Sequence, residues 1–250
     1  MKILLVNPPN CGRSIPEEEY GIDTIKMIFR GEPLALEVIA GNLDGHDVAI
    51  ADLKVTPDVL GKTLEQFEPD LVGFTGVTCE ANTVVRLAGE VKRNSDALVV
   101  VGGHHASCDP AFFNHDAIDY IVMGLGKLSF RELVDAIANR TVSSGVAGVA
   151  KTNPGGSLDY VRRAYSHADM VDDRPPRYDL VAQHRDQYVM SGVGGKVGFV
   201  ASAYGCTHRC SFCSIPNMTD GRYLTHRPAA VLRDMQLLGE VPVVRLVDAN

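Results

Sequence analysis

The sequence predicts an α/β protein whose first 150 residues form a doubly wound parallel β-sheet. Short, continuously apolar segments alternate there with longer segments of helical periodicity, and glycine-rich turns follow most of the apolar segments. Continuous apolar character is typical of parallel strands, which are buried on both faces. The regular alternation of strands and helices indicates βαβ units, whose helices cover both faces of one sheet.

Five strands and four helices are expected in this part of the chain. The strands are the apolar segments at 3–6, 47–51, 70–75, 97–101 and 118–123. The helices are the periodic segments at 33–43, 57–67, 84–91 and 130–138. Gly45 follows the first helix as a stop signal. Pro57 suits the first turn of the second helix, because that turn leaves its N–H groups without helical partners.

The character of the chain changes after residue 150. Residues 151–195 contain several Pro, Gly and Asp clusters and one short helix expected at 180–188, and we interpret them as a linker of turns and solvated charges. A strand is then expected at 197–202, a helix at 229–238 and a strand at 243–247. Residues 196–250 are therefore predicted to begin a second β/α domain.

Composition excludes several classes of protein. The formal net charge of −7 gives no general attraction to nucleic acid or to anionic membranes. No apolar segment is long enough to span a membrane, and the apolar run at 1–6 is too short for a signal sequence. Six cysteines in a chain without an export signal indicate reduced thiols and a cytoplasmic location.

Three cysteines near the end of the chain carry the most specific signal. Cys206, Cys210 and Cys213 have the spacing C-x3-C-x2-C, and three thiolates this close form a soft ligand set suited to iron–sulfur or zinc. In a four-iron cluster, three protein thiolates leave one iron open for a substrate or cofactor. Phe212, directly before the last cysteine, could place an aromatic face beside an adenine.

This loop resembles the C-x3-C-x-aromatic-C motif of radical S-adenosylmethionine (SAM) enzymes. The resemblance implies a [4Fe–4S] cluster on the three cysteines, SAM chelating the open iron, and Phe212 near its adenine. It also implies a partial TIM-type β/α barrel, of which this chain supplies only the first units. Asp248 and Asn250, at a strand end, lie where the family contacts SAM or substrate, although a simple strand-end turn explains them equally well.

Polar and glycine-rich loops follow the predicted strands of the first domain. Such loops at the carboxyl ends of parallel strands let a ligand approach the backbone. Together with the cysteine motif, they resemble the cobalamin-binding radical SAM family, whose N-terminal domain is Rossmann-like and whose Gly-Gly-x-His-x-Ser/Thr loop cradles the nucleotide tail. The resemblance implies cobalamin contacts at Pro8, Asn10, Thr78, Gly102, Gly103, His105, Ser107, Gly124 and Gly126.

The sequence departs from the family at two points. Where relatives commonly have Gly-Glu-Gly-Glu after the fifth strand, this chain has Gly-Leu-Gly-Lys at 124–127. The D-x-H-x-x-G signature is absent, so neither His104 nor His105 is assigned to cobalt. Taken alone, the loop at 102–107 is also compatible with a tight strand-to-helix connection that carries surface histidines.

The resemblance implies a radical SAM enzyme that uses cobalamin to methylate an unactivated carbon of a small-molecule or lipid substrate. An electron donor such as flavodoxin or ferredoxin would be its partner. Two alternatives remain. One is a methylthiotransferase-type enzyme whose second cluster is held by Cys11, Cys79 and Cys108, all after predicted strand ends. The other is a non-catalytic zinc-binding module with His208 or His226 as fourth ligand.

Overall fold

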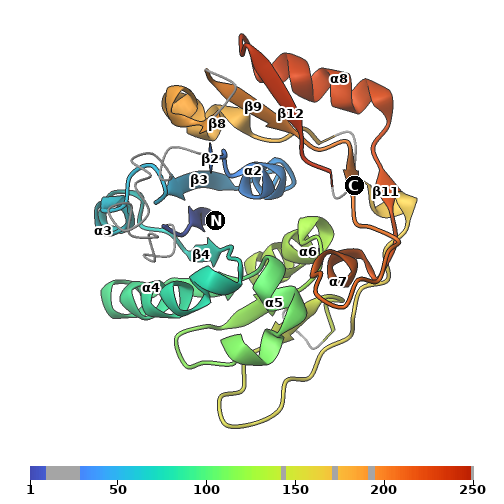
Figure 1. Ribbon diagram of the computed structural model, residues 1–250. Helices are drawn as coiled ribbons and strands as arrows, with labels where there is room; N and C mark the ends of the chain where they lie inside the picture. Colours follow the sequence, from blue (N-terminus) through green and yellow to red (C-terminus); the bar gives the residue numbers. More distant parts are fainter. Residues whose placement is uncertain (10–28, 142–144, 171–173, 191–194, 249–250) are drawn as a thin grey trace, which may run out of the picture.

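The computed structural model describes residues 1–9, 29–141, 145–170, 174–190 and 195–248. Its centre is a six-stranded sheet with the order β3-β1-β4-β5-β6-β7 (Figure 1). The strands of this sheet are β1 (Lys2–Asn7), β3 (Asp47–Asp52), β4 (Leu71–Phe74), β5 (Leu98–Val101), β6 (Tyr120–Val122) and β7 (Val149–Lys151). All pairs are parallel except β6 with β7, so the predicted fold class is confirmed, with one antiparallel edge strand that the sequence did not predict.

Helices cover both faces of this sheet. They are α2 (Leu34–Gly41), α3 (Val59–Phe67), α4 (Ala81–Asn94), α5 (His104–Cys108) and α6 (Lys127–Ala138). Leu4 and Val6 of β1 face a core shared with α3 and α4, whereas Ile3 and Leu5 face a core shared with α2 and α6. Alternate residues of a strand point to opposite faces, which is why the strand reads as one continuous apolar run.

The order of the strands creates a switch point between β1 and β4. The chain leaves β1 toward β3 on one side, and it returns through α3 to β4 on the other side of β1. In such sheets the loops after the two strands diverge and leave a crevice at the carboxyl ends of the strands. The loops predicted to bind cobalamin therefore meet at one end of the sheet.

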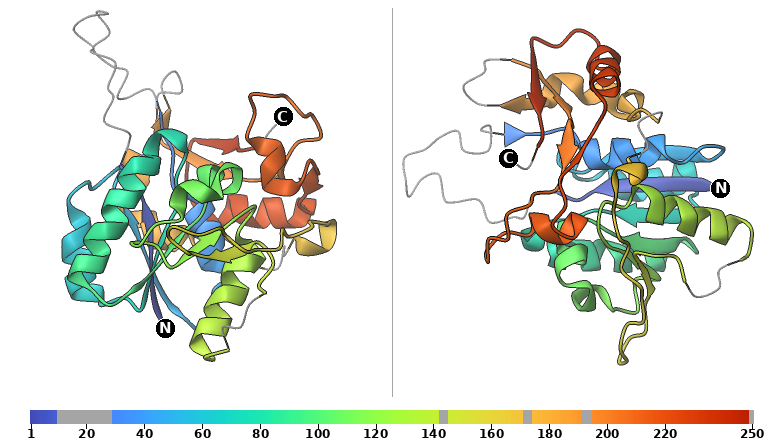
Figure 2. Two further views of the ribbon diagram at one scale, coloured as in Figure 1. Left: turned by 90° about the horizontal axis from the view of Figure 1, so that it is seen from below. Right: turned by 90° about the vertical axis from the view of Figure 1, so that its right-hand side faces the viewer.

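The C-terminal part forms a separate small layer (Figures 1 and 2). Strands β9 (Val197–Val200) and β12 (Val243–Leu246) pair in parallel, and α8 (Pro228–Leu237) packs against them. Two short strands, β10 (Ala203–Tyr204) and β11 (Leu224–Thr225), pair antiparallel and enclose the cysteine loop, which contains α7 (Ile215–Thr219). Strands β9 and β12 with α8 between them form one β-α-β unit.

The linker is more buried than its composition indicated. It carries the 3-10 helices η4 (His167–Asp169) and η5 (Tyr178–Gln187), and β8 (Val189–Met190) pairs with β2 (Phe29–Arg30). The interpretation of its charges as solvated is wrong for Arg163 and Arg185, whose side chains are each 13% exposed and ion-paired. Arg185 pairs with the buried Glu32, whose other oxygen accepts the Phe199 N–H at 2.6 Å. The linker thus holds the two parts of the molecule together.

Within the described residues, no helix combines the length and the apolar character that a membrane-spanning segment needs.

Candidate functional site

The cysteine loop starts from a turn that requires glycine. Gly205 has φ +80°, and a Cβ there would lie 2.1 Å from both the Arg222 carbonyl oxygen and Thr219 Oγ1. Thr219 is fully buried and donates to the Arg222 carbonyl at 2.7 Å. The β10–β11 pairing and this packing fix the two ends of the loop, while the cysteines lie between them.

The three predicted cluster ligands are free thiols on one loop. Cys206 and Cys213 are half-buried, Cys210 is exposed, and the Cys213 N–H donates to the Cys210 carbonyl at 3.0 Å. In the described part of the chain, no three His, Cys, Asp or Glu side chains are already arranged around a metal position. The donor set nevertheless fits a [4Fe–4S] cluster, because three thiols follow one another on a single exposed turn. Phe212 is 89% exposed on the same loop.

The glycine loops at the sheet end are packed closely against one another. Gly103 has φ +95°, and a Cβ there would lie 2.7 Å from Thr75 Oγ1 and 2.9 Å from the Gly76 nitrogen. Ser107 Oγ donates to the Gly103 carbonyl at 2.8 Å and accepts the Gly124 N–H at 2.9 Å. Ser107 therefore joins the loops after β5 and β6, so its hydroxyl has a structural role in addition to any cofactor contact.

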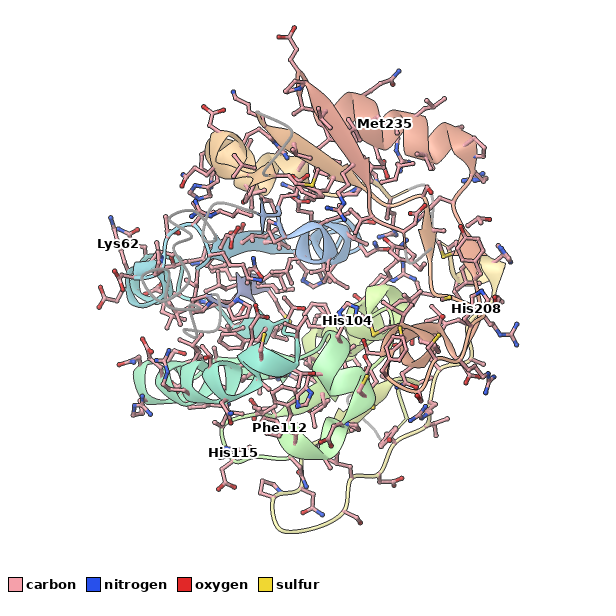
Figure 3. All side chains as sticks on the ribbon, in the orientation of Figure 1. Lys62, His104, Phe112, His115, His208 and Met235 are labelled. Atoms are coloured by element: carbon pink, nitrogen blue, oxygen red, sulfur yellow. The ribbon has the colours of Figure 1, made fainter. Side chains whose placement is uncertain are left out.

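His105 does not point into the same space as its neighbour. Its ring packs edge-on against Phe112 and Phe113, with centroids 4.9 and 5.5 Å away, and its Nδ1 lies 3.3 Å from Thr78 Oγ1. The predicted contacts Thr78 and His105 are thus brought together by a hydrogen bond between the loops after β4 and β5. His104 instead lines the cavity described below, and Figure 3 labels it toward the middle of the molecule.

A cavity of about 340 Å³ lies between the sheet end and the C-terminal layer. Gly102, Gly103, Gly124 and Gly126 line it on one side, and Tyr204, Gly205 and Asp248 line it on the other. It continues inward as an apolar slot between the sheet and the helices α2 and α6, lined by Leu5, Gly73 and Phe130. Of the predicted cofactor contacts, these four glycines and Asp248 thus share one cavity.

Two ionisable side chains of the N-terminal domain also line this cavity. Burial lowers the pKa of His104, which therefore favours the neutral imidazole at neutral pH. Lys127 is only 5% exposed, and its Nζ lies 5.8 Å from the centroid of the Tyr204 ring, a cation–π contact. Neither residue was predicted to have a role in the site, although Lys127 was visible as a departure from the family loop.

Asp248 supports the turn that leads into the cysteine loop. Its Oδ1 accepts the N–H groups of Ser202 and Ala203 at 2.9 and 3.0 Å, and its Oδ2 accepts the Ser202 hydroxyl. Asp248 therefore has a structural role at the end of β12, which is one of the two explanations that the sequence allowed. Because it also lines the cavity, a contact with SAM stays a prediction.

The remaining predicted residues are placed as follows. Pro8 directly follows β1 and is not among the residues that line the cavity. Asn10, Cys11 and Asn250 lie outside the described residues. Cys79 and Cys108 are exposed, and Cys108 contacts Ser214 and Asn217 on the cysteine loop. The described residues therefore offer no assembled ligand set for a second cluster.

Comparisons with known proteins agree with this arrangement. The family model of the B12 binding domain matches residues 22–134. An uncharacterized methyltransferase of Pyrococcus horikoshii is 32% identical over 248 residues, which cover 95% of this chain and 50% of that protein. The cytidylyl-2-hydroxyethylphosphonate methyltransferase of Streptomyces wedmorensis is 24% identical, over 85% of this chain and 47% of its own length.

A solved structure shares nearly the whole fold. The radical SAM methyltransferase TsrM from Kitasatospora setae, solved with tryptophan and a SAM analogue, matches 99% of this chain and 47% of its own. Its TM-score is 0.69 and its sequence identity 25%. The chain spans about half the length of the curated relatives that it matches.

The fold and the site together define a B12-binding domain followed by the first units of a radical SAM core. The chain belongs to the cobalamin-binding radical SAM enzymes, as its motifs predicted. The match to the B12 binding domain confirms cobalamin as the expected cofactor of the N-terminal domain. The reading as a non-catalytic zinc module is not supported.

Proposed function

We propose that the protein is the front part of a cobalamin-dependent radical SAM methyltransferase that methylates an unactivated carbon of a small molecule. One observation carries the proposal: a single cavity is lined by the strand-end glycines of the B12-binding domain and by Tyr204 and Gly205. These two residues directly precede Cys206. A corrinoid at the glycines and a cluster on the cysteines would therefore face a common space.

The residues of the N-terminal domain fit a large cofactor with a flat, apolar tail. Gly73 lets two side chains of the slot lining pack close to the sheet, since a Cβ there would lie only 3.0 Å from the Leu5 side chain and 3.4 Å from Phe130. Gly103 and Gly124 allow a ligand to approach the backbone at the slot entrance. The slot lining is predominantly apolar, which favours burial of an apolar group.

The C-terminal part fits a cluster and its bound nucleoside. Gly205 lets the chain turn directly from β10 into the cysteine loop, and Asp248 holds the preceding turn through two backbone N–H groups. When bound, the cluster would supply SAM cleavage and the corrinoid would supply the methyl group. The neutral His104 and the ammonium of Lys127 line the space between them, where they can bind and orient polar groups of a substrate.

The cluster half of the proposal can be tested by metal analysis. Protein reconstituted anaerobically with iron and sulfide should hold about four iron atoms per chain. Replacing Cys206, Cys210 and Cys213 together with Ala should abolish iron binding, whereas cobalamin binding remains. Cys79→Ala, which changes another exposed cysteine outside the loop, serves as the control. Iron that persists in the triple variant, or zinc in place of iron, would refute the assignment.

A lipid substrate and an electron donor such as flavodoxin or ferredoxin remain predictions, as does the cytoplasmic location. The electron donor can be tested by comparing the rate of SAM cleavage with a chemical reductant alone and with reduced flavodoxin, which should increase the rate.

A further inference from the structure

A tyrosine of the linker is bound to one of the cofactor loops. Tyr165 is 6% exposed, and its hydroxyl accepts the N–H of Leu125 at 2.9 Å and donates to the carbonyl of Met123 at 3.4 Å. Both partners belong to the loop after β6, in which Gly124 and Gly126 are the predicted cofactor contacts. The hydroxyl thus forms hydrogen bonds with the backbone of a loop that lines the cavity, although Tyr165 lies 40 residues after Leu125 in the sequence.

The loop and the tyrosine fit each other closely. Gly124 has φ +81°, and a Cβ at this position would lie 2.1 Å from the Tyr165 hydroxyl oxygen. Burial raises the pKa of Tyr165, so its hydroxyl stays protonated and keeps its donor role at neutral pH. The glycine is therefore needed at this point as much for the tyrosine as for a ligand.

The ring of Tyr165 also packs against the strands that enclose the cysteine loop. Tyr165 forms a small core with Met170 and Leu224, against which Leu125 and Tyr204 pack. Leu224 and Tyr204 are paired across β10 and β11, the two strands that enclose the cysteine loop. The buried side chain of Tyr165 thus contacts both the loop after β6 and the two strands that enclose the cysteine loop.

We propose that Tyr165 is a positioning residue that fixes the loop at 124–126 relative to the cysteine loop, and thereby sets the separation of the two cofactors. This inference rests on the proposed function. Its hydroxyl acts on the backbone of the loop, whereas its ring acts as the spacer between the two loops. The linker, through this residue, is part of the cofactor site.

The test compares two tyrosines of the linker. Tyr165→Phe keeps the ring and removes the hydroxyl. Tyr178→Phe removes an equally buried hydroxyl, which donates to the Phe199 carbonyl at 3.0 Å, away from the cofactor loops. Tyr165→Phe loses two buried hydrogen bonds and Tyr178→Phe loses one, so both variants should lose stability to a similar order.

The expected result is specific to Tyr165. The Kd of Tyr165→Phe for cobalamin should rise about tenfold, because the two hydrogen bonds between the hydroxyl and the loop after β6 are lost, and the EPR spectrum of bound Co(II) cobalamin should change. Tyr178→Phe should bind cobalamin within about twofold of the unchanged protein, and iron content should be the same in all three. Equal cobalamin affinity in Tyr165→Phe and the unchanged protein, or equal weakening in both variants, overturns the inference while the proposed function stands. If the unchanged protein binds no cobalamin, the proposed function itself fails, and the inference with it.

Discussion

Replacing Gly103 with Ala tests whether the loop after β5 is as tightly built as its geometry indicates. Gly103 has φ +95° and ψ −165°, a region that is almost restricted to glycine, and a side chain there costs about 1–3 kcal/mol. The new methyl group would also lie 2.9 and 3.0 Å from the nitrogen and carbonyl oxygen of Gly76, backbone atoms that cannot rotate away. Such overpacking adds about 1–3 kcal/mol, so the free energy of unfolding should fall by about 2–6 kcal/mol.

The matched control is Gly155→Ala. Gly155 also has a positive φ of +80°, but nothing lies within 4 Å of a Cβ placed there. It should therefore show only the backbone term, about 1–2 kcal/mol. Urea unfolding of both variants measures the difference, and equilibrium dialysis measures the cobalamin that each one retains. Our reasoning is wrong if Gly103→Ala unfolds at the same urea concentration as Gly155→Ala and binds cobalamin as the unchanged protein does.

Three further changes address the buried polar groups. Burial, and then the charge of Glu32, raises the pKa of Glu37 well above its usual 4.5. The folded state therefore keeps a proton that the unfolded state loses, and the free energy of unfolding should fall as pH rises from 4.5 to the raised pKa. Glu37→Gln should reduce this decline in urea unfolding measured across pH, and an unchanged slope would contradict the assignment. Arg185→Ala leaves the carboxyl of Glu32 buried without its cation and should lower the free energy of unfolding by about 3–5 kcal/mol. Adding Glu32→Gln to this variant should restore a part of that loss. If the losses of the two single variants simply add in the double variant, the two side chains do not stabilise each other. Ser107→Ala breaks the link between the two glycine loops, costs about 1–3 kcal/mol, and should weaken cobalamin binding in dialysis without changing iron content.

The sheet and its helices could be predicted from the sequence because their signals are local. All five predicted strands and four predicted helices of the N-terminal domain are present, with ends shifted by a few residues. The largest shift is in α4, which extends beyond its apolar stripe at both ends because polar residues complete its turns. Strand β7 was missed, since three residues of ordinary composition carry no periodicity.

The site could be predicted only in part. The cysteines and the strand-end glycines were visible as motifs, because chemistry and backbone conformation restrict the residue types there. A cofactor contact of His105 stays a prediction, whereas the packing of its ring against Phe112 and Phe113 is a contact that no spacing reveals. Tyr165 lies in a segment without motif or periodicity, and its role follows from a contact with Leu125 that only the folded chain brings about.

The burial of the linker has a practical meaning for anyone dissecting this protein. Tyr188 is fully enclosed and donates to Asp52 at 3.0 Å, and Asp52 in turn accepts from Asn7 at the tip of β1. A fragment that ends at residue 150 would expose this carboxylate to water at the end of β3, beside β1. Expression trials of the corrinoid-binding half alone should therefore keep the chain through Met190, and shorter pieces should prove prone to proteases.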